Sequence, residues 1–437
     1  MVWKSALRLA LAFPLCLPLA LPVAAAGTQG AALTPDKYIA IMRHGVRPQT
    51  SSKELTHYSA KAWPVWDVAD GMLTAHGAKA AEKLAGWEMS MLRDKGLVAQ
   101  SGCPAPGEVF GWANGSVQRT IDTGNVILST MFPGCGLAVG FNKTGDVDVL
   151  YAASDAALGA IDPEQAKTAI LDAAGGNFDA MTAKAAPLMK ELDGILGCET
   201  SACSMAERPW TIDMKEAKGD KPASVSVKGP LAEAGTLVQV FLLQYANGFP
   251  ADQLAFGKAS TSADIIRLSE LRQWKYDVGN RVPYLARRDA SNFLNQILLA
   301  TAAGTTEATG TDGPPNAKFL LFMGSDTQQA EVATLLDLHW HIPPYVDDET
   351  PPTGALTFER LHDAMGKAYV RLGFVAPTLD QIRDASTLDA KTPPLQAAVT
   401  LPGCESEMVE GACPLESFLK IARASLDMSA VATQAYR

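Results

Sequence analysis

One stretch decides the fold: Tyr38-Ile39-Ala40-Ile41-Met42-Arg43-His44-Gly45-Val46-Arg47. Its first five residues are apolar, and the run is short enough to form a buried strand. The strand ends at polar residues, which is typical of an α/β sheet whose ligand binds beyond the carboxyl ends of the strands. The stretch therefore predicts a strand that leads directly into a site.

A second junction of the same kind lies near the other end of the chain. Phe319–Met323 is a strongly apolar run, Gly324-Ser325-Asp326-Thr327 follows it, and a helix is expected through Leu336. Two further strands are expected at Val109–Trp112 and Ala355–Phe358. If these strands share one sheet, the polar residues at both junctions lie at one edge of it.

Helical periodicity occupies much of the remaining chain. Helices are expected at Thr74–Leu97, Ser116–Met131, Pro163–Leu196 (two helices), Leu231–Tyr245, Ser262–Leu285 and Arg288–Ala303. Met214–Lys228 is polar and is expected to be a loop. The pattern predicts an α/β fold, with a parallel sheet, helices on both faces and a helical insertion. The core is expected to comprise 27–150 and 261–437, and the helical domain 151–260.

The residues at the first junction suit phosphoryl transfer. Arg43 and Arg47 flank His44, so two forked cations lie beside a nucleophile and can neutralise phosphate oxygens. Gly45 lets the backbone approach a ligand closely. A solvated histidine between surface arginines is the alternative, but the preceding strand and the second arginine favour a functional site.

With this motif the chain resembles the histidine acid phosphatases, in particular the bacterial periplasmic phytases and glucose-1-phosphatases. The resemblance covers nearly all of the chain after its first residues, and includes Trp63–Val68, Gln118-Arg119-Thr120, Leu243-Gln244-Tyr245 and Thr350–Gly354. It implies a phosphoglycerate-mutase-like fold and a small phosphorylated substrate. It also implies that no metal or other cofactor is needed.

The resemblance assigns a role to each site residue. His44 would attack phosphorus and become phosphorylated, and Asp326 would protonate the leaving oxygen. The residues that would bind the substrate are Arg43, Arg47, Arg119, Thr50 and Ser325. The alternatives are an exposed helix arginine for Arg119 and a helix N-cap for Asp326, and a capping residue can also be an acid.

The chain departs from the family pattern in two places. Pro48 follows Arg47 directly, whereas the family usually places this proline one residue later. Ser325 stands where the family has a histidine that donates to the phosphate. Loss of one charge-assisted hydrogen bond costs about 1.5–3 kcal/mol, or about 10- to 150-fold in rate. The alternative to an enzyme is therefore a phosphate-ester-binding protein with weak or lost catalysis, although a binder needs neither His44 nor Asp326.

The substrate is not identified by the sequence, but two features favour a sugar phosphate. The segment Arg47–Ser51 contains no lysine, which weakens the case for a highly charged inositol phosphate. Gln244–Pro250 is more similar to the glucose-1-phosphatases. A cytoplasmic phosphoglycerate-mutase-like enzyme shares the Arg-His-Gly start, but the chain length, the cysteines and the N-terminal segment argue against it.

The first 26 residues are expected to be an export signal. Lys4 and Arg8 precede the apolar stretch Leu9–Leu21, and Ala24 and Ala26 have the spacing of a cleavage site. Cleavage is expected after Ala26. The remaining chain is expected to be periplasmic or secreted, with no membrane segment.

Cysteine usage agrees with export, and the net charge bears on the possible partners. Closeness in sequence favours the pairs Cys198–Cys203 and Cys404–Cys413, which leaves Cys103–Cys135. A metal site is the weaker alternative, because no Cys-x-x-Cys occurs. Removal of the signal takes the formal net charge from −10 to −12, so nucleic acid is not an expected partner. The sequence does not indicate the oligomeric state.

Overall fold

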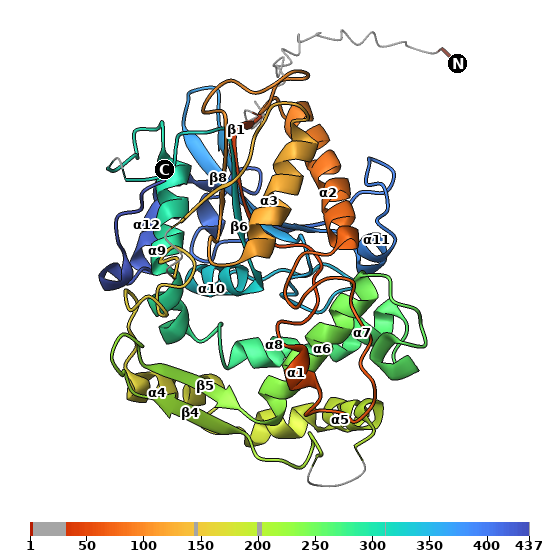
Figure 1. Cartoon of the computed structure of the whole chain (residues 1–437). Helices are drawn as coiled ribbons and strands as arrows, with labels where there is room; N and C mark the ends of the chain where they lie inside the picture. The colour runs from red at the N-terminus through yellow and green to blue at the C-terminus, as the bar shows by residue number, and fades with distance from the viewer. Residues whose placement is uncertain (3–31, 144–146, 199–202, 311, 437) are drawn as a thin grey trace. The chain divides into compact units, whose positions relative to one another are not determined.

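The computed structural model describes residues 1–2, 32–143, 147–198, 203–310 and 312–436. Ala32–Arg437 forms one compact unit, which contains the sheet and the helices (Figure 1). Residues 3–26 of the expected export signal, with its cleavage point, lie outside the described residues. The boundaries expected near 150 and 260 stay predictions.

A large sheet forms the centre of this unit. In the described part of the chain it has the strand order β10-β8-β7-β1-β6-β2-β3, with β9 paired to β8. The strands are β1 (Thr34–Arg43), β2 (Val109–Ala113), β3 (Gly140–Phe141), β6 (Phe319–Gly324), β7 (Ala355–His362), β8 (Ala368–Ala376), β9 (Leu395–Val399) and β10 (Cys413–Pro414). The four strands expected from the sequence are confirmed as β1, β2, β6 and β7.

The sheet is mixed, which refines the expectation of a parallel one. β6 pairs in parallel with both β1 and β2, so the part that carries the two junctions is parallel as expected. On its other side β1 pairs antiparallel with β7, and β7 pairs antiparallel with β8. The turn at 363–367 that joins β7 to β8 is short, and only antiparallel neighbours can be joined so closely.

Helices cover both faces of the sheet, as expected. Ile39 and Ile41 of β1 pack with residues of α9 (Pro283–Ala302), α10 (Asp326–Leu336) and α12 (Leu415–Ala424). Ala40 and Met42, which point to the other face, pack with α2 (Ala75–Asp94) and α3 (Gln118–Met131). A strand buried on both faces reads as an unbroken apolar run, which explains the sequence of β1.

The middle of the chain is mainly helical and lies beyond the sheet in Figure 1. Its helices are α4 (Pro163–Ala173), α5 (Asp179–Leu196), α6 (Pro230–Ala246), α7 (Ser262–Leu268) and α8 (Glu270–Asp277). Two short helices, α1 (Ser52–Leu55) and α11 (Leu379–Arg383), occupy loops. The helix expected at Ser262–Leu285 is interrupted, because α7 ends before Ser269 and a new helix begins at Pro283, a favoured first residue.

The loop expected at Met214–Lys228 is wrong in part. β4 (Thr211–Lys215) and β5 (Ser224–Lys228) form an antiparallel hairpin. In β5 the two valines are half-buried and the other three residues are exposed. Because the exposed face is polar, the composition of this segment concealed a strand of period two.

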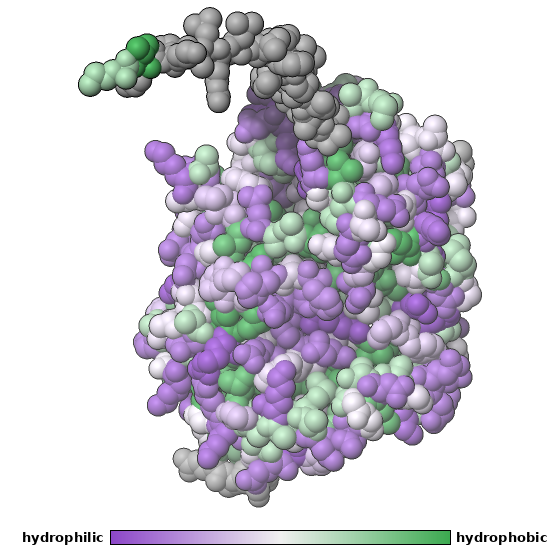
Figure 2. Space-filling view, turned by 180° about the vertical axis from the view of Figure 1, so that it is seen from behind, coloured by the Kyte–Doolittle hydropathy of each residue, from purple (hydrophilic) through white to green (hydrophobic). Residues whose placement is uncertain are grey.

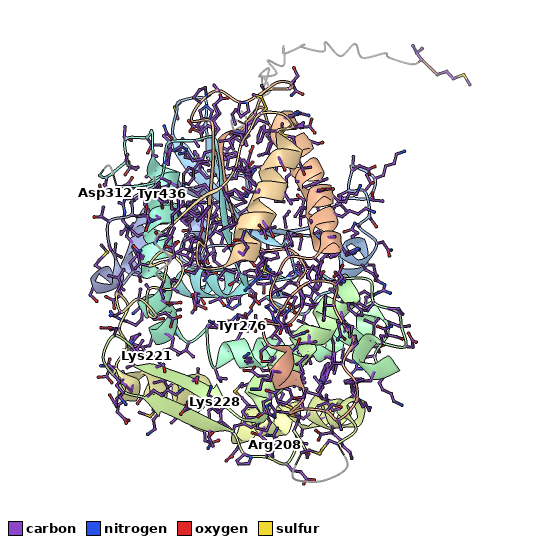
Figure 3. All side chains as sticks on the ribbon, in the orientation of Figure 1. Arg208, Lys221, Lys228, Tyr276, Asp312 and Tyr436 are labelled. Atoms are coloured by element: carbon purple, nitrogen blue, oxygen red, sulfur yellow. A yellow bond between two sulfur atoms is a disulfide. The ribbon has the colours of Figure 1, made fainter. Side chains whose placement is uncertain are left out.

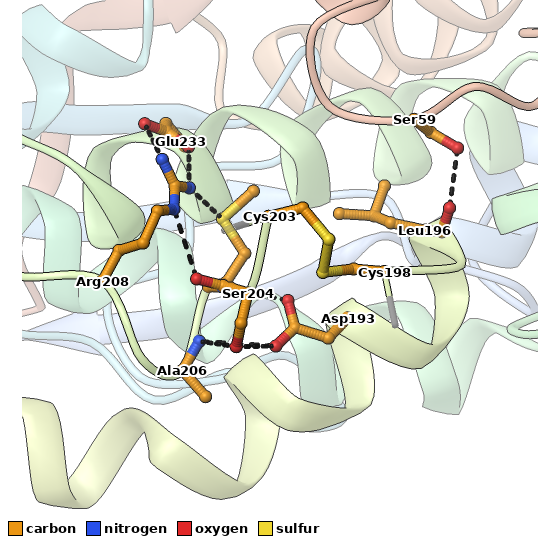
Figure 4. The surroundings of a disulfide bond; sticks show 10 residues. Ser59, Asp193, Leu196, Cys198, Cys203, Ser204, Ala206, Arg208 and Glu233 are labelled. Atoms are coloured by element: carbon orange, nitrogen blue, oxygen red, sulfur yellow. Dashed lines mark hydrogen bonds and ion pairs between the residues drawn. A yellow bond between two sulfur atoms is a disulfide. The ribbon is translucent and has the colours of Figure 1, made fainter. Parts of the chain in front are cut away.

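The six cysteines of the compact unit pair as predicted, as Cys103–Cys135, Cys198–Cys203 and Cys404–Cys413. Figure 4 shows the Cys198–Cys203 bridge beside the end of α5. Next to it, Asp193 accepts a hydrogen bond from Ser204 Oγ at 2.6 Å. The loop after α5 is therefore held by polar contacts as well as by the disulfide.

The surface seen in Figure 2 is mostly hydrophilic, with hydrophobic residues scattered over it. Large exposed hydrophobic side chains such as Val65 and Met365 stand apart from one another in sequence. Among the described residues, none of the helices combines the length and the apolar character of a membrane span.

Helix α2 buries an acidic side chain, Glu88, on the side that packs against the sheet. Glu88 has 0% exposure, and neither carboxyl oxygen has a hydrogen-bond partner among the described residues. Burial raises the pKa of Glu88 to about 8, because removal from water penalises the charged form. The Glu88 carboxyl is therefore protonated in acidic solution.

Candidate active site

The sheet brings the two predicted junctions together. β1 and β6 are parallel neighbours, and Arg43 is the register partner of Gly324. The peptide N–H of His44 donates to the carbonyl oxygen of Gly324 at 3.2 Å. Two motifs that are far apart in sequence thus start from adjacent strand ends, where ligands of α/β sheets bind.

A cavity of about 290 Å³ opens beyond these strand ends. Five predicted site residues line it: Arg47, Thr50, Arg119, Ser325 and Asp326. The other two, Arg43 and His44, are fully buried beside these residues. Other lining residues come from the segment 49–55 and from helices α6 and α8, including Tyr276, which Figure 3 labels between the sheet and the β4–β5 hairpin.

The His44 imidazole is held in one tautomer, in which Nε2 keeps its lone pair. Nδ1 lies 2.9 Å from the carbonyl oxygen of Gly45, so Nδ1 carries the proton and Nε2 the lone pair. Nε2 is buried and has no hydrogen-bond partner within the described chain. Burial, together with Arg119, Arg47 and Arg43, lowers the pKa of His44 well below 6.5. His44 therefore keeps its lone pair in mildly acidic solution.

Three arginines around His44 have donors to spare. Arg43 Nε and Nη2, Arg47 Nε and Arg119 Nε are buried and make no hydrogen bond among the residues described, although Arg43 Nη2 is within ion-pair distance of Asp326. Burial and repulsion by Arg119 and Arg43 lower the pKa of Arg47 to about 9. Unused donors on buried cations are costly unless an anion binds to them. The arrangement therefore favours a phosphate beside Nε2.

Ser325, and not Asp326, is the N-cap of α10. Its hydroxyl accepts a hydrogen bond from the Thr327 N–H at 3.2 Å and donates to Gln328 Oε1 at 2.8 Å. The expectation that Asp326 caps this helix is thus corrected, and its carboxylate is free for other contacts. The Ser325 hydroxyl has one hydrogen, so it can donate to a phosphate only if its hydrogen bond to Gln328 is broken.

The Asp326 carboxylate is paired with two arginines. Oδ2 lies 2.6 Å from Arg272 Nη2 and 3.5 Å from Arg43 Nη2. Burial by itself raises the pKa of Asp326, but the two cations outweigh it and hold this pKa well below 3.8. Asp326 is therefore ionised in mildly acidic solution.

Two residues of the cavity were missed in the sequence. Arg272 is a single arginine on an amphipathic helix, and its partners Asp326 and Glu349 are 54 and 77 residues away. No local pattern indicates it. Gln239 of α6 also lines the cavity, and both its amide atoms are buried with no partner in the described part of the chain. In the sequence, only the family resemblance at Leu243–Tyr245 could have indicated that α6 contributes to the site.

Among the described residues, no group of three or more His, Cys, Asp or Glu side chains is arranged to hold a metal ion.

Comparison with known proteins links this geometry to a family. The sequence model of the histidine phosphatase superfamily (branch 2) matches residues 36–375. Phytase AppA of Escherichia coli is 29% identical over 397 residues, covering 88% of this chain and 90% of that protein. Glucose-1-phosphatase of Salmonella typhimurium is 28% identical over 409 residues, covering 89% and 93%. The apo form of Hafnia alvei phytase matches with a TM-score of 0.84 at 27% identity, over 93% of this chain and all of that one.

Proposed function

The chain belongs to branch 2 of the histidine phosphatase superfamily, and on that premise we propose that it hydrolyses phosphomonoesters through a phosphohistidine on His44. The observation that carries the proposal is the buried Nε2 of His44, which has no partner in the described chain and lies among arginines with unused donors. A nucleophile and cations for the equatorial oxygens are what phosphoryl transfer requires.

The reaction has two half-reactions. In the first, Nε2 of His44 attacks phosphorus and the bond from phosphorus to the leaving oxygen breaks. The leaving oxygen takes a proton through Asp326, whose ionised carboxylate receives it from the monoanionic phosphate of the substrate. In the second, water attacks the phosphohistidine and gives a proton to Asp326. The P–N bond breaks, its electron pair returns to His44, and phosphate leaves. Arg43, Arg47 and Arg119 neutralise the phosphate oxygens in both.

The wall beyond the arginines supports a sugar monophosphate as substrate. It is formed mainly by neutral side chains, with Thr50, Ser51 and Thr236 among them, and by one acid and one base, Glu54 and Lys275. The amide of Gln239 can both donate to and accept from a hydroxyl group, and its two polar atoms have no partner in the described chain. A relative, Hafnia alvei phytase, has been solved in complex with myo-inositol hexakis sulphate, so phytate is the substrate to compare.

Export to the periplasm or the exterior is part of the proposal. It is supported by the N-terminal segment of the sequence and by three disulfides, which persist in oxidising compartments.

The test is to trap the intermediate. Purified enzyme is mixed with ³²P-labelled substrate at acidic pH and quenched, and the label is mapped to a peptide. We expect acid-labile label on the peptide that contains His44, and none in His44→Ala. His57→Ala, which changes an exposed histidine, is the matched control and should label like the wild type. Absence of label from a folded, phosphate-binding wild type would instead support the binding-protein alternative.

A substrate panel tests the proposal that the substrate is a sugar monophosphate. We expect kcat/KM for glucose 1-phosphate to exceed that for phytate, and Gln239→Leu to lower the former by about 5- to 10-fold, as expected for loss of about 1–1.5 kcal/mol of hydrogen bonding. Turnover of p-nitrophenyl phosphate, whose leaving group has no sugar hydroxyls, should change little. A preference for phytate would exclude the sugar-phosphate proposal and leave the chemistry at His44 unaffected.

A further inference from the structure

The cavity contains a buried arginine that the proposed mechanism does not use. Arg272 of α8 is 2% exposed. Its Nη1 donates to Glu349 Oε1 at 2.5 Å, and its Nη2 donates to Asp326 Oδ2 at 2.6 Å. The guanidinium carbon lies 4.8 Å from the centre of the Tyr276 ring. These contacts fix the guanidinium between an anchoring carboxylate and the carboxylate of the proposed acid.

Glu349, which binds Arg272 on the side opposite Asp326, is itself held by other residues. Glu349 is fully buried and also accepts hydrogen bonds from Gln273 Nε2 at 2.8 Å and from the Thr350 N–H at 3.1 Å. Thr350 Oγ1 accepts a further bond from Arg272 Nη2 at 3.0 Å, and the Thr350 carbonyl accepts one from Arg43. Residues 349 and 350 thus hold both arginines that contact the Asp326 carboxylate.

Arg272 also adds a positive charge close to position 325. The Ser325 hydroxyl is uncharged, and its hydrogen is donated to Gln328 in the helix cap. The second cation beside Asp326 comes instead from α8, in the helical part of the chain. A positive charge next to the start of α10 therefore comes from another element.

We propose that Arg272 is a positioning residue for Asp326: its bond to Oδ2 orients the carboxylate for proton exchange, and it adds a cation in the part of the site where Ser325 carries no charge. The inference rests on the proposed function. Its effect falls on the second half-reaction. There water forms a bond to phosphorus, the P–N bond breaks with its electrons returning to His44, and one proton of the water moves to Asp326. Only the ionised carboxylate can accept that proton.

The charges around Asp326 predict how this step depends on pH. The groups that face it are Arg43 and His44 at the end of β1, Arg47 after it, Arg119 on α3, and Arg272, Lys275 and Tyr276 on α8. Removal of the Arg272 charge leaves burial, which raises the pKa of Asp326, opposed mainly by Arg43. Less of the carboxyl is then ionised near pH 4, and the second half-reaction slows there.

The experiment measures hydrolysis of the trapped phosphohistidine between pH 3.5 and pH 6.5 by rapid quench. His44 is phosphorylated at this stage, so its own titration as a free imidazole does not enter. In Arg272→Gln we expect hydrolysis to slow by about 10- to 100-fold, with the slowing greatest at the lowest pH. Arg272→Lys, which keeps the charge but not the fork, should slow hydrolysis without changing the shape of the pH profile.

Arg281→Gln is the matched control. Arg281 also lies over the Tyr276 ring, at 5.6 Å, but its partners are Asp277, Gln273 and the Asp348 carbonyl rather than Asp326. We expect this variant to hydrolyse the phosphohistidine as the wild type does, with the same pH profile.

The outcomes separate this inference from the proposed function. If the wild type forms no phosphohistidine, the proposed function fails, and the inference fails with it. If it does, and Arg272→Gln keeps the wild-type rate or loses rate equally at every pH, the inference alone is wrong. Should Arg272→Gln not fold, the double variant Arg272→Met/Glu349→Leu replaces the buried ion pair by apolar groups, an exchange that folds often tolerate, and the same pH criterion applies to it.

Discussion

The two strand ends that form the site are neighbours in the sheet but differ in how far their polar groups are already satisfied. After β1, the arginines and Nε2 of His44 retain buried polar atoms that have no partner in the described chain. After β6, Ser325 is engaged in the helix cap and Asp326 is paired with Arg272. The first end is prepared for an anion, while the second is already occupied by internal partners. Under the proposed function, phosphate binds at the first strand end and protons are exchanged at the second.

The largest effect is expected at the first strand end. His44→Ala removes the nucleophile but leaves the three arginines in place, so kcat should fall by about three orders of magnitude or more. Phosphate binding should persist because the cations remain. Calorimetric titration with inorganic phosphate, beside kinetics, checks both parts. Loss of phosphate binding in a folded His44→Ala protein would contradict the division of labour between the two strand ends.

A smaller and selective effect is expected at the second end. Asp326→Asn cannot transfer a proton, so turnover of a sugar phosphate should fall about 100-fold or more. p-Nitrophenyl phosphate needs little protonation of its leaving group, so its phosphorylation of His44 should be affected much less. The ratio of single-turnover rates on the two substrates is the measurement. Equal losses on both would show that Asp326 acts on the phosphate and not on the leaving oxygen.

The smallest effect on rate is expected from restoring the family's histidine. If Arg272 already supplies the charge, Ser325→His should raise kcat/KM by less than about tenfold, which is below the range of about 10- to 150-fold expected for a missing donor. The same change removes the cap of α10 and should lower the free energy of unfolding by about 1 kcal/mol. Kinetics and thermal unfolding of one preparation test both. A rise of about 100-fold would show that Ser325 is a defect that nothing compensates.

The same contrast explains what the sequence could predict. The strands at Tyr38–Met42 and Phe319–Met323 are apolar on both faces, so composition alone located them, and parallel pairing then placed their polar ends together. Arg272 could not be located in this way, because its function arises from contacts with residues 54 and 77 positions away. The β4–β5 hairpin was missed because its exposed side chains are as polar as those of a loop.

The buried carboxyl of Glu88 makes folding of this chain a proton-binding reaction. Its pKa is about 8 in the folded chain against an ordinary value of 4.5, so the folded chain holds a proton that the unfolded chain releases between these values. The stabilising contribution is complete below about pH 4.5, and it declines by about 1.4 kcal/mol per pH unit until the folded-state pKa is passed.

Glu88→Gln, which cannot lose a proton, should therefore gain thermal stability relative to the wild type when the pH is raised from 4.5 to 7.5. Glu82→Gln, at an exposed position of the same helix, should show no such gain. This one carboxyl, buried between α2 and the sheet, thus favours the folded chain at acidic pH, independently of the proposed catalytic groups.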